Sequence, residues 1–167
     1  MRVYLPCTLP RLREVLATGS VEVGPDGLVG FAVTPALREW YTEGDLEELE
    51  YAATTAAARA SLRLLADEGE ALRRVVLAAD VPDGQARPAP DLDRAAVRVA
   101  GPVPLRMVQS GLVDVPAAVG DVRRAVSALP AAASGDDDAV FIVESVEDHE
   151  LAWYAAQELP VLVELET

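Results

Sequence analysis

The sequence contains no lysine, one cysteine, one histidine and few aromatic residues. A single cysteine cannot form an internal disulfide, so nothing indicates an oxidising compartment. A single histidine means that any histidine-based metal site would need carboxylates as its remaining ligands. Aromatic residues make up 5% of the chain and hydrophobic residues 51%, so alanine, valine and leucine must fill the core.

Motifs that mark particular chemistries are also absent. The sequence has no glycine-rich phosphate loop with its lysine, no dinucleotide-binding glycine motif, no paired-cysteine metal site and no nucleophile elbow. No apolar run approaches the roughly 20 residues that span a bilayer, and prolines and charges interrupt the start where a secretion signal needs an apolar stretch. We therefore expect a cytoplasmic protein, and the sequence indicates no cofactor and no metal site.

Positive charge is scarce. Acidic residues outnumber basic ones by 28 to 14, which gives a formal net charge of -14. Nucleic acids and anionic membranes are bound mainly through neutralisation of their negative charge, so we expect neither as a partner. All basic residues are arginines, which together with abundant alanine, valine, aspartate and glycine indicates a GC-rich bacterial genome, with salt adaptation as the alternative.

The length of 167 residues is typical of one domain, and we expect residues 1–167 to form a single globular α/β unit. Alternating apolar residues predict a strand over residues 1–6. After it, Thr8 has the character of an N-cap, and apolar helical spacing predicts a helix that ends at Gly19.

Two consecutive helices are predicted after the next strand candidate. Thr34 and the proline that follows it favour a helix start, and Gly44 favours its end. Asp45 and Glu48 then have the spacing of a capping box, and an apolar stripe continues to about residue 66.

The second half of the chain contains several strand candidates, and no helix is predicted between the first three of them. The predicted strands are 73–81, 95–101, 107–115 and 139–145, the predicted loops are 82–93 and 130–138, and the predicted helix is 116–129. Residues 160–167 fit either a last strand or a terminal helix. The pattern predicts an α/β (α+β) sandwich, in which helices pack on a mixed, partly antiparallel sheet of about five strands.

The segment "EDHELAWYAAQEL", residues 147–159, contains the only histidine. His149 stands beside Glu150 and two other carboxylates, and a carboxylate can orient an imidazole or share a divalent metal with it. The alternative is the start of a helix, because Ser145 and Asp148 have capping-box spacing and acidic residues favour a first helical turn. We expect the helix start.

Both tryptophans, Trp40 and Trp153, are followed by tyrosine, and such a pair can form an amphipathic wall for a ligand or partner. If residues 147–159 are helical, His149, Trp153 and Gln157 share one face. Large aromatic residues in an aromatic-poor chain usually anchor the core, so we expect core positions, with a binding surface as the alternative.

Cys7 lies between the first strand and the amides of the first helix. That position can lower the pKa of a thiol and make it nucleophilic, but no histidine lies near it in sequence. We expect a small buried hydrophobic side chain instead.

Two stretches carry a resemblance to a known family. "FAVTPALREWYTEGDLEELEYAATTAAARASLRLL" and "EDHELAWYAAQELP" resemble an uncharacterised family of short actinobacterial proteins, a domain of unknown function. Its members begin with a segment similar to "RVYLP" and are collinear over nearly the whole chain. The resemblance implies a bacterial cytoplasmic protein and carries no activity, cofactor or site.

Two functional hypotheses follow. The first is a non-enzymatic interaction or regulatory module, bound to a protein partner or self-associating, in which the Trp40 and Trp153 segments supply the contact surface. The second is a small-molecule enzyme or ligand-binding protein that uses His149 with Glu150 or a distant carboxylate, with a divalent metal as an option.

Overall fold

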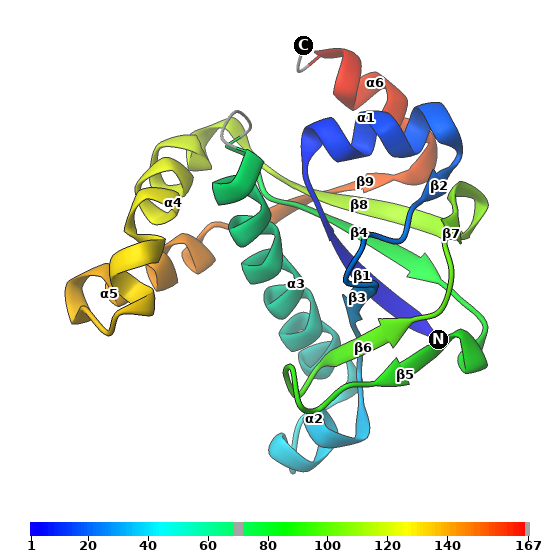
Figure 1. Cartoon of the computed structure of the whole chain (residues 1–167), viewed down its shortest axis with the longest axis horizontal. Coiled ribbons are helices and arrows are strands. Elements are labelled where there is room, and N and C mark those ends of the chain that lie inside the picture. The colour runs from blue at the N-terminus through cyan, green and yellow to red at the C-terminus, as the bar shows by residue number, and fades with distance from the viewer. Residues whose placement is uncertain (69–71, 166–167) are drawn as a thin grey trace.

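The computed structural model describes residues 1–68 and 72–165, which form a sheet with helices on both faces (Figure 1). The strands are β1 (Arg2–Cys7), β2 (Ser20–Val21), β3 (Leu28–Phe31), β4 (Val75–Asp80), β5 (Ala86–Pro88), β6 (Ala96–Val99), β7 (Val103–Pro104), β8 (Val108–Asp114) and β9 (Leu151–Ala155). The helices are α1 (Leu9–Thr18), α2 (Pro35–Trp40), α3 (Leu46–Glu68), α4 (Val119–Ala133), α5 (Asp137–Ser145) and α6 (Leu159–Leu165).

The main sheet has seven strands in the order β5-β6-β3-β1-β4-β8-β9, and β2 pairs with β7 in a separate ribbon. The predicted α/β (α+β) class with helices packed on a sheet is confirmed. The sheet is larger than the expected five strands, and each pairing is antiparallel rather than mixed. After α1 the chain passes through β2 and a turn at Gly27, whose φ is 86°, so β3 enters the sheet opposite in direction to β1.

Three predicted helix starts, at Thr8, Thr34 and Asp45, are confirmed, because each is built from contacts within a few residues. The Thr8 hydroxyl accepts the Arg11 N–H at 3.3 Å, and the Asp45 carboxylate accepts the Glu48 N–H at 2.9 Å. α1 ends as expected at Gly19, which has a φ of 81°. The helix that begins after Thr34 is shorter than predicted and ends at Trp40 rather than at residue 44.

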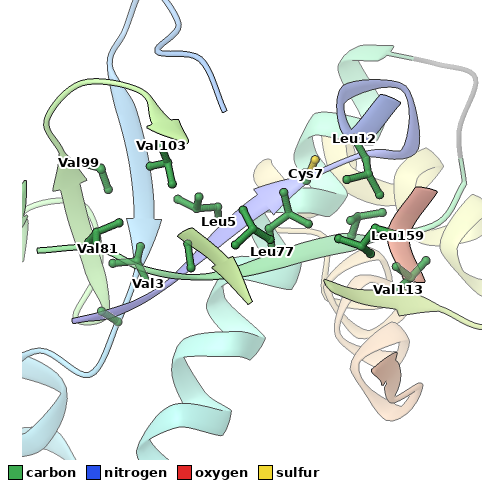
Figure 2. Packing of buried hydrophobic residues seen from close by; sticks show 14 of the residues in the cluster. Val3, Leu5, Cys7, Leu12, Leu77, Val81, Val99, Val103, Val113 and Leu159 are labelled. Atoms are coloured by element: carbon green, nitrogen blue, oxygen red, sulfur yellow. The ribbon is translucent and has the colours of Figure 1, made fainter. Parts of the chain in front are cut away.

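Two hydrophobic layers lie on opposite faces of the sheet. On one face, alternate residues of the central strands pack against α1 and α6, as Figure 2 shows for Leu5, Leu12, Leu77 and Leu159. On the other face, Tyr4 and its neighbours pack against α3, whose buried side is largely alanine. The small side chains let this helix lie close to the sheet, and α4 with α5 packs on its C-terminal half.

The predicted helix over residues 147–159 is wrong. A short 3₁₀ turn, η4 (Val146–Asp148), ends at His149, residues 151–155 form β9, and a second turn, η5 (Ala156–Glu158), leads into α6. His149, Trp153 and Gln157 therefore share no helical face. The Ser145 hydroxyl donates to the Phe141 carbonyl at 2.6 Å at the end of α5, so it does not form the expected capping box.

Four other segments differ from the predictions or settle an open choice. Residues 139–145 are helical in α5, because pairing with α4 buries their apolar side in place of a strand neighbour. α4 continues through Pro130 into the predicted loop, and Asp136 then caps α5. The predicted loop over 82–93 contains β5, and residues 159–165 form a helix. Within the described ranges, no helix is both long and apolar enough to cross a bilayer.

Candidate functional site

One face of the sheet is only partly covered. α3 packs mainly on β1, β3 and β4, so the α3 side of β8 and β9 stays open beside the helix. Two adjoining hollows of about 350 and 300 Å³ lie there, and they share Tyr51, Thr54 and Leu112 as walls. We call this surface the aromatic groove: Tyr51 and Thr54 of α3, Leu112 of β8, and Leu151 and Trp153 of β9.

Trp153 reaches the groove because β9 is a strand. Alternate side chains of a strand point to opposite faces, so Leu151 and Trp153 face α3 while Tyr154 packs into the layer under α1 and α6. Trp153 lies directly across from Leu112 in the antiparallel register. The Trp153 side chain is 63% exposed and that of Tyr51 is 62% exposed, so the groove carries two large aromatic side chains in contact with solvent.

The tryptophans are not core anchors. Trp40 is 62% exposed, and its ring lies 3.7 Å from the Arg94 guanidinium, in a cation–π contact on α2. The expectation that these residues fill the core is wrong. Smaller side chains fill the layer between α3 and the sheet, where most of the buried residues are alanines.

His149 lies at one end of the groove, in the hollow of about 350 Å³. Its Nε2 atom lies 2.6 Å from the Asp121 Oδ2 atom of α4, and its carbonyl accepts a hydrogen bond from Arg74 Nη2 at 3.1 Å. Asp121 also forms an ion pair with Arg124. The carboxylate that orients the imidazole therefore comes from 28 residues earlier in the chain, and not from Glu150 or the other acidic neighbours.

An oriented imidazole of this kind is suited to proton transfer or to ligand binding. The described residues contain no group of three His, Cys, Asp or Glu side chains placed to hold a metal ion. A divalent metal at His149 would have Asp121 as its one further side-chain ligand in this arrangement.

A buried ion pair lies beneath the groove. Arg74 and Asp114 are 2% and 0% exposed, and the carboxylate accepts three hydrogen bonds from Arg74, from the backbone N–H, Nε and Nη2, at 2.7–2.8 Å. Arg74 thereby joins β4 and β8 to the backbone that enters β9 at His149. The pair fixes the position of the His149 end of the groove.

The groove is electrostatically negative. The two arginines that line the hollows are each held by a carboxylate, Arg2 by Asp80 and Arg74 by Asp114, and the Glu147 carboxylate of the larger hollow is paired with Arg59 of α3. Among the described residues, none of the remaining carboxylates along the hollows, Glu47, Glu50 and Glu150, forms a salt bridge. Burial and then the negative charge of Glu50 raise the pKa of Tyr4 at the floor, so this hydroxyl stays protonated.

The structure brings together some of the residues predicted to form a site and separates others. His149 and Glu150 line one hollow, and Trp153 lines the adjoining one. Gln157 lies in η5 and Trp40 in α2, and neither is among the described residues that line these hollows. Sequence reasoning missed Tyr51, Asp121 and Arg74.

Of those three, Tyr51 had a local signal. It is a large aromatic residue in an otherwise alanine-rich helix, and the helical spacing of the apolar stripe leaves it off the buried side. Asp121 and Arg74 become part of the site only through contacts with distant segments, so no pattern near them in the sequence indicates it.

Cys7 is the buried hydrophobic side chain that the sequence predicts. It is 3% exposed within the layer under α1, and burial raises the pKa of its thiol to about 12. A thiol with this pKa stays protonated at neutral pH and is not a nucleophile.

A family model, described as a family of unknown function (DUF6912), matches residues 1–163. This range includes each strand of the structure and all but the end of α6, so the predicted membership of an uncharacterised domain family is confirmed. No curated protein and no solved structure matches the chain.

Proposed function

We propose that this chain, which belongs to the family of unknown function DUF6912, is a non-enzymatic interaction module. A partner protein binds it at the aromatic groove. One observation carries the proposal: Trp153 and Tyr51 are both more than 60% exposed on the same groove. Tryptophan and tyrosine are the residues that most often dominate binding energy at interfaces. The net charge of -14 supports a partner that is not a nucleic acid. The lysine-free composition supports a bacterial source, and the single cysteine supports a cytoplasmic location.

The test is site-specific photo-cross-linking in the native host. A photoreactive residue replaces Gln109, which lies on β8 next to Ser110, a residue that lines the smaller hollow, and the cross-linked partner is compared between variants. We expect Trp153→Ala and Tyr51→Ala to abolish capture of one reproducible partner. Trp40→Ala is the matched control, because Trp40 has nearly the same exposure and lies outside the groove. Equal capture by all three variants would refute the proposed function.

A second candidate function rests on the His149–Asp121 contact, which places an oriented imidazole in the hollow of about 350 Å³. In this alternative the chain binds a small metabolite, with His149 as the group that recognises or protonates it. A thermal-shift screen with metabolites and divalent metals should then give a hit that His149→Ala removes while the unliganded melting temperature is unchanged. Loss of stability without any change in ligand response would sink this candidate.

A further inference from the structure

The free edge of the main sheet lies beside the aromatic groove. Building on the proposed function, we propose that β9 is a docking edge to which a partner protein adds an extended, cationic segment as an antiparallel strand. Strand addition at a sheet edge uses backbone hydrogen bonds for affinity and alternate side chains for specificity. The partner's cationic side chains would lie on the α3 face, against Trp153 and the groove carboxylates.

Backbone hydrogen bonds along β8 show which groups of β9 face outward. The Asp114 N–H donates to the Arg74 carbonyl at 3.0 Å, so Asp114 faces β4 and the adjacent Val113 faces β9. Val113 is opposite Ala152 in the register, and bonding sides alternate along an antiparallel strand. The N–H and C=O groups of Leu151, Trp153 and Ala155 therefore point away from the sheet.

One of these outward groups already has a partner of a different kind. The Ala155 N–H donates to the Glu158 carboxylate at 3.1 Å, at the start of the turn that leads into α6. Among the described residues, the N–H groups of Leu151 and Trp153 donate no hydrogen bond to any segment other than β8. All five residues of β9 keep some exposure, and within the described part of the chain no strand pairs with this edge.

The two edge strands of the main sheet differ in the features that protect an edge against the addition of another strand. β5, at the opposite edge, is three residues long and ends in Pro88, which has no N–H to offer. Proline and short length are common means of blocking an edge. β9 is five residues long, has the sequence LAWYA and contains neither charge nor proline. The sheet is thus blocked at one edge and open at the other.

The carboxylates around β9 indicate which kind of segment would pair with this edge. Glu150 and Glu158 flank β9, Glu47 and Glu50 lie across the groove, and the chain carries a net charge of -14. A lysine or arginine on the α3 face of an added strand would lie near these carboxylates and over the Trp153 ring, where a cation–π contact is favourable. An acidic segment would be repelled at every one of these positions.

A second copy of this chain is disfavoured by the same charges. Two-fold antiparallel pairing centred on Trp153 would bring the acidic turn of one chain that ends at Asp148 toward the turn of the other that ends at Glu158, at both ends of the new strand pair. Two chains that each carry a net charge of -14 also repel each other. We therefore assign the edge to a different, cationic chain.

The experiment uses Trp40→Phe protein, in which Trp153 is the sole tryptophan and reports on its own surroundings by fluorescence. The probe is an acetylated, amidated heptapeptide of alternating arginine and valine, titrated at 0.15 M salt. Side chains directly opposite in an antiparallel pair lie on one face, so the residues that bond to β9 are those whose side chains face α3.

Two methylated peptides of identical composition provide the matched control. We expect N-methylation at the arginines, whose N–H groups face β9, to weaken binding by at least about tenfold, because several backbone hydrogen bonds are lost. The same number of N-methyl groups at the valines, whose N–H groups face solvent, should change the Kd less than about twofold. A peptide with glutamate in place of arginine should not bind.

Amide hydrogen exchange gives a second readout that needs no variant. Peptide binding should slow exchange at the Leu151 and Trp153 amides and leave the β5 edge unchanged. Equal binding by both methylated peptides, or by the glutamate peptide, would overturn the inference, as would no peptide binding at all. A dimeric protein whose Leu151 and Trp153 amides are already slow would assign the edge to a second copy and overturn it too. In each of these cases the cross-linking test still decides the proposed function separately.

Discussion

Breaking the buried Arg74–Asp114 pair should destabilise the fold and loosen the groove together. The first perturbation, Asp114→Asn, keeps an oxygen for the Arg74 backbone N–H but leaves the guanidinium uncompensated at 2% exposure. The second, Arg74→Met, leaves a carboxylate at 0% exposure with the backbone N–H as its remaining donor from Arg74. The double variant combines an amide that the backbone N–H satisfies with an apolar side chain of similar length.

The magnitude follows from the burial of both partners. Removing one member of a fully buried pair costs about 3–5 kcal/mol, because the charge that remains is neither hydrated nor neutralised. At this chain length 1 kcal/mol corresponds to a shift in Tm of about 2–4 °C, so each single variant should melt roughly 10 °C lower. The effects of substituting two residues in contact are not additive. We expect the free energy of unfolding of the double variant to be about 2–3 kcal/mol higher than the sum of the two single effects predicts.

The assay is urea unfolding of the wild type, the two single variants and the double variant. Asp91→Asn is the matched control, because Arg98 holds Asp91 by the same two-bond geometry on the exposed surface. Its unfolding midpoint should stay at the wild-type value. Arg74→Met should also speed exchange of the Ala152 amide, which pairs with Val113 of β8, since the Arg74 bond to the His149 carbonyl just before β9 is lost.

Single variants that each cost less than about 1 kcal/mol, with a double variant equal to their sum, would refute the reasoning. That result would mean that water or another polar group compensates the charge left behind.

Three further predictions follow from packing and from the pKa shifts. Gly111→Ala should destabilise the fold by about 1–3 kcal/mol, because a Cβ atom there would lie 2.6 Å from a side-chain carbon of the buried leucine that begins α6, whereas Gly84→Ala meets no atom within 4 Å and should leave urea unfolding unchanged. Cys7 should resist iodoacetamide at pH 8 and react only in denaturant, because its pKa is about 12 in the folded chain; labelling of the native protein at the denatured rate would contradict its burial. The hydrogen bond from Arg2 lowers the pKa of Asp80 below its unfolded value, so its contribution, at most about 1 kcal/mol for so exposed a pair, is fully present above the unfolded pKa near 3.9 and is lost as pH falls through the folded pKa. Asp80→Asn should therefore lower stability at pH 7, and its effect should shrink as the pH falls below about 3.9.

The candidate site shows most clearly what the sequence leaves open. His149, Glu150 and Trp153 are rare or charged residues close together in the chain, and they lie along one groove. Their grouping as a helical face was wrong. The local sequence of residues 147–159 is compatible with a helix, and the pairing of β9 with β8 decides otherwise.

The partner of His149 could not be predicted at all. Asp121 reaches the imidazole because α4 lies against the turn before β9, and 28 residues separate the two side chains along the chain. The acidic neighbours of His149 are candidates in the sequence only because they are close to it along the chain. In the structure Glu147 pairs with Arg59 instead, and the carboxylate that bonds the imidazole is that of Asp121.

The sequence by itself determined those features that depend on contacts within about four residues. Thr8 and Asp45 begin their helices through their own side chains, Gly19 ends one, and the alanine stripe that follows Asp45 predicts a long buried helix. Tertiary structure alone decided that the segment after His149 is an edge strand and that Trp153 faces solvent. A strand takes its hydrogen bonds from another part of the chain, so its existence and the direction of its side chains are properties of the pairing and not of the local sequence.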